Sequence, residues 1–167
     1  MKTLLFLILS LILSQCNSSP SVTYRGTFYK GEPQLEEAIL AKINTERKKE
    51  GLSPLRMDER LVQAARQHSQ EMEELNYFSH TSPVSENAAF TDRIKQVGVS
   101  YGTAGENIAY TSSSSSADQF VSMWMNSEGH RKNILGATYD RTGIGVYAGS
   151  KVLATQIFVQ YREEKGK

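Results

Sequence analysis

Cysteine is almost missing from this chain: Cys16 is the single one among 167 residues. One cysteine cannot form an internal disulfide, so the fold must be held together by its core. Because Cys16 lies ahead of the predicted domain, a cysteine nucleophile inside that domain is also excluded.

An excess of charge of either sign is missing as well. Nineteen Lys and Arg residues oppose eighteen Asp and Glu residues, and without Lys2 the two signs balance. No basic patch stands out, so nucleic acid is not an expected partner. No basic amphipathic stretch favours binding to a membrane surface through charge.

The N-terminus has the features of a secretory signal. In residues 1–15, Lys2 precedes an apolar run over residues 4–13 that is too short to span a bilayer. The segment ends Leu-Ser-Gln-Cys at Cys16, which resembles a bacterial lipobox, although Gln15 replaces the usual small residue. The alternative is a plain signal with an incidental cysteine. We expect lipidation of Cys16 and a membrane-anchored lipoprotein of the cell envelope or cell surface.

The rest of the chain is predicted to form a tether, one domain and a short tail. Residues 16–33 are rich in Ser, Gly and Thr and suit a flexible tether, residues 34–163 form the domain, and residues 164–167 are the tail. Helical spacing of apolar residues and start and stop signals predict helices at residues 34–50, 58–75, 91–97 and 116–125. Their predicted N-caps include Asp58, Thr91 and Ser116.

The end of the chain is predicted to be a β-hairpin. Residues 143–148 and 151–161 flank Gly149 and Ser150, which suit a two-residue turn of the primed type. The second strand is apolar on both faces and therefore needs cover on both sides. Residues 105–110 are either a strand or an extended segment. Helices first and strands last predict an α+β fold, a three-layer α-β-α sandwich.

Four protonatable residues are candidates for one cleft: His80, Glu106, Glu128 and His130. Imidazole and carboxylate groups suit zinc or another divalent first-row metal, and they could equally form a general acid/base set. Their spacing alone assigns no role, because neither a His-Glu-x-x-His helix nor a Gly-x-Ser-x-Gly elbow is present. A fifth candidate, His68, lies on the apolar stripe of its helix and is interpreted as buried and hydrogen-bonded.

Five segments in order resemble the CAP superfamily of cysteine-rich secretory, antigen 5 and pathogenesis-related 1 proteins, and more narrowly its short bacterial branch with the SCP domain. Single motifs of this kind are weak, but five in sequence are specific. The resemblance covers residues 35–161. Its segments are Ala-Ala-Arg-Gln-His-Ser at 64–69, Phe-Ser-His at 78–80, Gly-Glu-Asn-Ile-Ala at 105–109, the run 124–135 from Trp to Leu, and Gly-Ile-Gly-Val at 143–146.

The resemblance implies an α-β-α sandwich and a cleft with two histidines and two acids. Carried over by motif, these are His80, Glu106, Glu128 and His130, a set expected to hold zinc or another divalent metal. Two departures from eukaryotic members matter. Here a single glycine separates Glu128 from His130 in place of a long insertion, and disulfides are absent. Sterol binding linked to those eukaryotic loops is therefore not transferred.

Several functions remain open from the sequence. The favoured hypothesis is a non-enzymatic binding module whose cleft holds a divalent metal, a small ligand or an envelope component. Alternatives are a metal-dependent hydrolase or peptidase with Glu106 or Glu128 as general base, a weaker acyl-transfer site at Ser127 and His130, and an envelope adhesin or host-interaction protein. The amides of Asn107 and Asn133 are expected to pin loops through hydrogen bonds to the backbone.

Overall fold

The computed structural model describes residues 29–84, 86, 88–112 and 115–162. The predicted signal, the lipidation site Cys16, most of the tether and the C-terminal tail lie outside these residues. None of the described helices is both long and apolar enough to cross a membrane.

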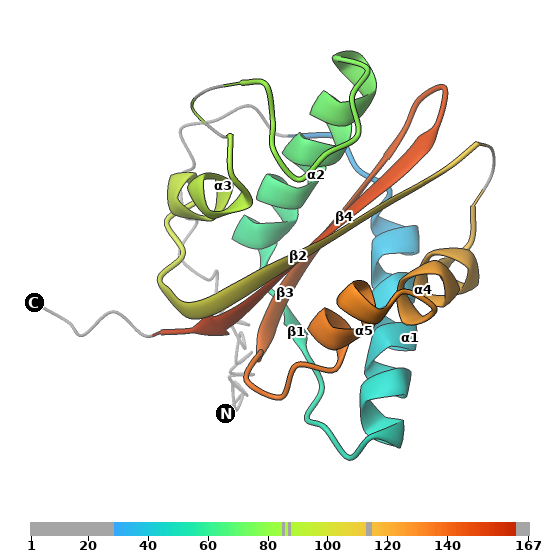
Figure 1. Cartoon of the computed structure of the whole chain (residues 1–167), viewed down its shortest axis with the longest axis vertical. Coiled ribbons are helices and arrows are strands. Elements are labelled where there is room, and N and C mark those ends of the chain that lie inside the picture. The colour runs from blue at the N-terminus through green and yellow to red at the C-terminus, as the bar shows by residue number, and fades with distance from the viewer. Residues whose placement is uncertain (1–28, 85, 87, 113–114, 163–167) are drawn as a thin grey trace, which may run out of the picture.

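A four-stranded sheet runs through the middle of the molecule (Figure 1). Its strands lie in the order β1-β3-β4-β2, so β2 forms one edge. The central pairs are antiparallel, and the short β1 pairs in parallel with β3. The strands are β1 (Arg56–Met57), β2 (Tyr101–Thr111), β3 (Arg141–Ala148) and β4 (Val152–Tyr161).

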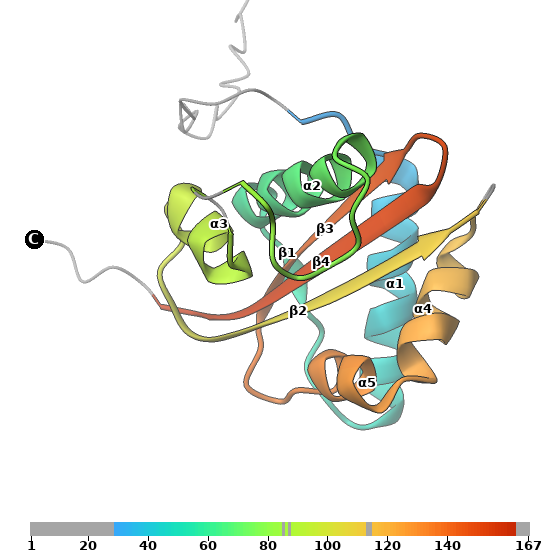
Figure 2. The same cartoon turned by 45° about the horizontal axis from the view of Figure 1, so that its top comes forward.

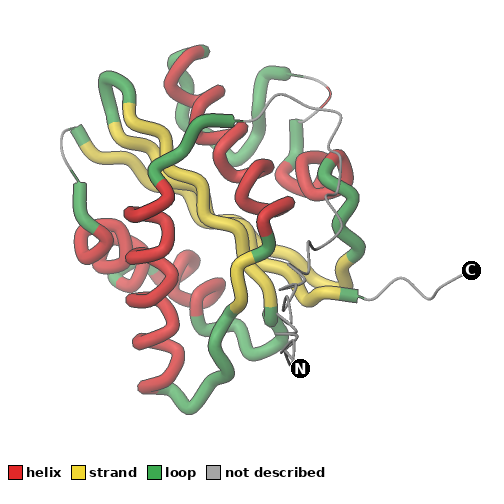
Figure 3. Tube along the Cα trace, turned by 180° about the vertical axis from the view of Figure 1, so that it is seen from behind, coloured by secondary structure: helices red, strands yellow, loops and turns green. Residues whose placement is uncertain are grey.

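Helices cover both faces of this sheet (Figures 2 and 3). One layer contains α2 (Glu59–Glu74) and α3 (Phe90–Gln96), and its core includes Leu61, Ile94 and Ile157. The other contains α1 (Pro33–Lys49), α4 (Ala117–Met125) and α5 (Glu128–Ile134). The predicted three-layer α-β-α sandwich is confirmed, and so is the double cover of β4, which is buried from Leu153 to Val159.

Two glycines of β3 let α2 lie directly on the sheet. A Cβ atom at Gly143 would collide with the backbone of Leu61, and one at Gly145 would collide with the backbone of Arg66. Since backbone cannot give way as a flexible side chain can, α2 needs glycine at both positions. This contact holds the first half of α2 against the sheet, and the loop that carries His80 follows the end of the same helix.

Two of the three helix caps predicted above are confirmed. Asp58 accepts the N–H of Arg60 at 2.9 Å, and Ser116 accepts that of Gln119 at 3.3 Å. The prediction of Thr91 as a cap is wrong. Helix α3 begins one residue earlier, with Ala89 as the N-cap, and the Ala89 N–H donates to the carboxylate of Asp92 at 3.2 Å.

The predicted two-residue turn of the final hairpin is also wrong. Ala148 pairs with Val152, which leaves three residues in the loop, and Gly149 lacks the positive φ of a primed turn. The carboxylate of Glu73, at the end of α2, accepts the main-chain N–H groups of Ser150 and Lys151. A contact with a distant helix therefore decides the turn geometry.

Candidate functional site

The first histidine of the site, His80, follows α2 in a loop that a buried histidine holds in place. The Nε2 atom of His68 lies 3.0 Å from the Ser79 carbonyl oxygen, and its Nδ1 atom lies 3.3 Å from the Tyr77 hydroxyl. Because the carbonyl can only accept, Nε2 carries the proton and Nδ1 accepts. Burial lowers the pKa of His68 to about 4, so this ring is neutral at pH 7. The structural role expected for His68 is confirmed.

A buried carboxylate on β2 orients His80. The Oε1 atom of Glu106 lies 2.8 Å from Nδ1 of His80, and the Glu106 side chain is only 1% exposed. A carboxylate accepts here, so Nδ1 of His80 carries the proton. In neutral His80 the lone pair is then on Nε2, on a ring that is 52% exposed.

Arg93 of α3 balances the charge of this carboxylate. Its Nη2 atom donates to Oε2 of Glu106 at 2.7 Å and also to the His80 carbonyl oxygen at 3.2 Å. The Arg93 side chain is fully buried. Both oxygens of Glu106 are therefore engaged, one by an imidazole and one by a guanidinium. Arg93 was not among the residues predicted from the sequence. The available signal was its position next to the core residue Ile94 in a short helix.

The second histidine, His130, lies on α5, which two asparagines attach to β2. Asn107 donates to the His130 carbonyl oxygen at 3.1 Å, and Asn133 donates to the Glu106 carbonyl oxygen at 3.2 Å. The two amides also bond to each other at 2.8 Å. The backbone-pinning role expected for Asn107 and Asn133 is confirmed.

The charge of His80 acts on the imidazole of His130. Burial, and next the charge of His80, lowers the pKa of His130. His130 is therefore neutral at pH 7, which is the form that binds metals. The site thus has two imidazoles with available nitrogens, one of them held by a buried carboxylate.

The fourth predicted member, Glu128, has different surroundings. It is exposed in the first turn of α5, and no residue in the described part of the chain forms a hydrogen bond or ion pair with its carboxylate. Within these same residues, no group of three His, Cys, Asp or Glu side chains is placed to hold a metal ion. The donor set fits two imidazole ligands, and the four-ligand site stays a prediction.

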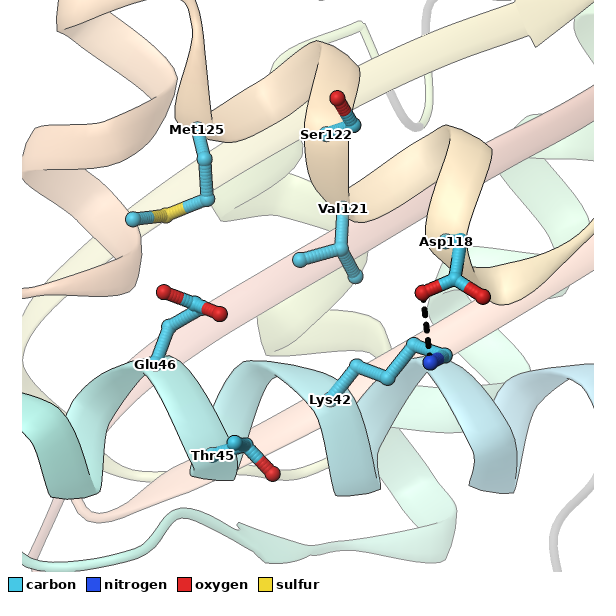
Figure 4. Close-up of a pocket in the computed structure, with 7 residues that line it drawn as sticks. All are labelled: Lys42, Thr45, Glu46, Asp118, Val121, Ser122 and Met125. Atoms are coloured by element: carbon cyan, nitrogen blue, oxygen red, sulfur yellow. Dashed lines mark ion pairs between the residues drawn. The ribbon is translucent and has the colours of Figure 1, made fainter.

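A groove of about 570 Å³ begins at His130 and follows β2. Its lining is mostly apolar and aromatic, with Phe78 contributed by the His80 loop and Met123 and Trp124 by α4. A smaller hollow of about 350 Å³ lies between α1 and α4, where Lys42 forms an ion pair with Asp118 (Figure 4). It contains neither site histidine.

The fold and site define an α-β-α sandwich domain with two histidines beside an edge strand, and known proteins share this fold. Residues 40–161 match the CAP family, the cysteine-rich secretory protein family, and the chain belongs to it. It is 45% identical to the uncharacterized protein YkwD of Bacillus subtilis over 124 residues, which are 74% of this chain and 46% of that protein. The chain thus spans less than half the length of this curated relative.

Two solved structures are similar. An extracellular SCP-domain protein of Bacillus anthracis is 35% identical with a TM-score of 0.70, and the match covers 77% of this chain and 41% of that one. An outer surface protein of Borrelia burgdorferi is 19% identical with a TM-score of 0.69, and the match covers 80% of this chain and 100% of that one. The second likeness concerns the fold alone.

Proposed function

We propose that this CAP domain is a binding module that works outside the cytoplasm and holds a divalent metal ion, with zinc as the first candidate, between His80 and His130. The observation that carries the proposal is the bond from Nδ1 of His80 to the buried carboxylate of Glu106. Metal-binding histidines typically donate their second N–H to a carboxylate in this way, which fixes the tautomer and the direction of the free nitrogen.

In this proposal Glu106 orients a ligand and does not bind the metal itself. Its second oxygen is occupied by Arg93 at 2.7 Å, and a guanidinium at that distance would repel a cation on the same carboxylate. The bound metal would supply a positive centre at which an anionic or carbonyl group of a small molecule or envelope component is held.

Location outside the cytoplasm is part of the same proposal. The apolar run at residues 4–13 supports export, and the extracellular character of the related Bacillus anthracis protein agrees with it. We propose that Cys16, as the only cysteine, carries the lipid that anchors the domain to the membrane.

Binding is better supported than hydrolysis. A hydrolase of this type needs a free general base, and Glu106 is paired with Arg93 and His80. Of the two predicted bases, this leaves Glu128, which is exposed on the first turn of α5. An acyl-transfer site would need Ser127 bonded to His130. The Ser127 hydroxyl forms no hydrogen bond with any residue that the structure describes.

Calorimetric titration of the full chain with zinc at pH 7 tests the metal proposal. We expect one-to-one binding that His80→Ala and His130→Ala each abolish. The matched control is Asp118→Asn, which changes an exposed carboxylate in the separate hollow between α1 and α4 and should leave binding unchanged. Glu128→Gln should also bind normally, because that carboxylate is outside the proposed ligand set. Loss of zinc binding in Glu128→Gln would support the four-ligand site instead. Absence of zinc binding by the unaltered protein would exclude a metal site.

A further inference from the structure

The groove beside His130 runs along the edge of the sheet. Five consecutive residues of one segment, 108–112, line it. Side chains of a strand alternate between its two faces, so a hollow on one face would be lined by every second residue. A hollow that is lined by consecutive residues must therefore run along the edge of the strand. Strand β2 is the outermost strand on this side, and its other edge pairs with β4.

Main-chain groups of alternate β2 residues point to the free edge of the strand, along which this groove runs. The carbonyl of Glu106 accepts from Asn133, and the carbonyl of Ile108 accepts from the indole Nε1 of Trp124 at 3.3 Å. Both donors come from helices and not from β4, so these carbonyls face the free edge. Because the pattern repeats every two residues, the N–H and C=O of Tyr110 face the same edge. No hydrogen-bond partner from the described residues meets them there.

The walls of the groove offer apolar contact surface. Phe78, Tyr110 and Met123 are 47%, 44% and 41% exposed, a large share for residues of this kind. The rings of Phe78 and Tyr110 pack edge to face at 4.9 Å, and the ammonium of Lys151 lies 5.4 Å from the Tyr110 ring centre. These neighbours already restrict the Tyr110 side chain, so it loses little conformational entropy when a ligand binds against it.

Two polar side chains of the groove are available to an occupant. The side chains of Gln119 and Ser127 line it, and neither makes a hydrogen bond with the described part of the chain. A suitable occupant therefore needs apolar groups together with regularly spaced hydrogen-bond donors and acceptors. An extended polypeptide has both, whereas a lipid tail has only the first.

We propose that the groove binds an extended peptide segment, which adds to the sheet as a strand beside Tyr110. Five residues of strand span about 16 Å, so a segment of about five residues fills it. Its side chains would alternate between the Phe78 wall and the Met123 wall. This site goes beyond the proposed metal site and does not require metal.

The test uses the purified full chain and a pool of acetylated, amidated heptapeptides with Val, Leu or Phe at positions 2, 4 and 6 and Ser, Gln or Lys elsewhere. Binding is measured by fluorescence anisotropy with zinc and again with EDTA, and the tightest peptide is then made in two forms, N-methylated at its odd or at its even residues. Strand addition uses the N–H groups of one set only. We expect one form to bind at least about tenfold more weakly and the other to bind like the parent.

Variants of the chain test the same contact from the protein side. Tyr110→Pro removes the N–H at the strand edge and should weaken binding of the parent peptide by about tenfold. The variant should still fold, since proline is tolerated at strand edges. Its matched control, Tyr110→Ala, keeps the N–H and should retain the difference between the two N-methylated forms. Binding should be equal with zinc and with EDTA. No binding by any peptide, or equal binding by both N-methylated forms, would overturn the proposal. Loss of peptide binding in EDTA would also overturn it, because it would mean that the peptide binds through the metal.

Discussion

Removing the buried guanidinium beneath the site should cost far more stability than removing a surface cation. Arg93 and Glu106 are joined at 2.7 Å, and their side chains are 0% and 1% exposed. Arg93→Met keeps most of the side-chain volume but leaves the Glu106 carboxylate buried without its cationic partner. Breaking a buried pair in this way costs about 3–5 kcal/mol, a large part of a domain's total stability of about 5–15 kcal/mol.

Urea unfolding at pH 7, followed by Trp124 fluorescence, measures this cost. The double variant Arg93→Met/Glu106→Gln removes the stranded charge, so it should be more stable than Arg93→Met alone. The matched control is Lys49→Met, which removes an exposed ion pair with Glu46 and should change the free energy of unfolding little. A loss below about 1 kcal/mol in Arg93→Met would refute the view that this pair supports the site.

Two further predictions concern His68 and Cys16. The folded pKa of His68, about 4, lies below the unfolded value of 6.5, so the unfolded state binds more protons between these values. Stability should therefore fall by up to about 3 kcal/mol as the pH drops from 6.5 to 4, and His68→Gln should flatten this part of the pH profile of unfolding. A profile with the same slope in the variant would contradict that assignment. Cys16→Ala should release the protein from membranes on fractionation of the cells, and persistent membrane association would exclude lipidation.

The layers of the fold were predictable because they depend on patterns that the sequence displays directly. The apolar stripe of α2 and the doubly apolar β4 each follow from local spacing, and both are confirmed. The turn at Gly149 was not predictable, since Glu73 reaches it from α2. Likewise the start of α3 depends on Asp92 capping the N–H of Ala89, a contact that competes with the expected Thr91 cap.

The contacts within the candidate site were only partly predictable. Motif order indicated His80, Glu106, Glu128 and His130. The structure joins His80 to Glu106 and attaches α5, which carries His130, to β2. The motifs did not indicate that Glu106 is paired with Arg93, because this arginine lies on α3, a segment with no recognised motif. Nor could spacing show the exposure of Glu128, which depends on how α5 is oriented against the sheet.

The central claim, metal held between His80 and His130, is tested most directly by nitrogen NMR of the imidazole rings during zinc addition at pH 7. We predict that Nε2 of His80 and one nitrogen of His130 shift on binding, that Nδ1 of His80 stays protonated against Glu106, and that His68 is unchanged. Zinc-induced shifts absent from both His80 and His130, or present with Nδ1 of His80 deprotonated, would contradict the account.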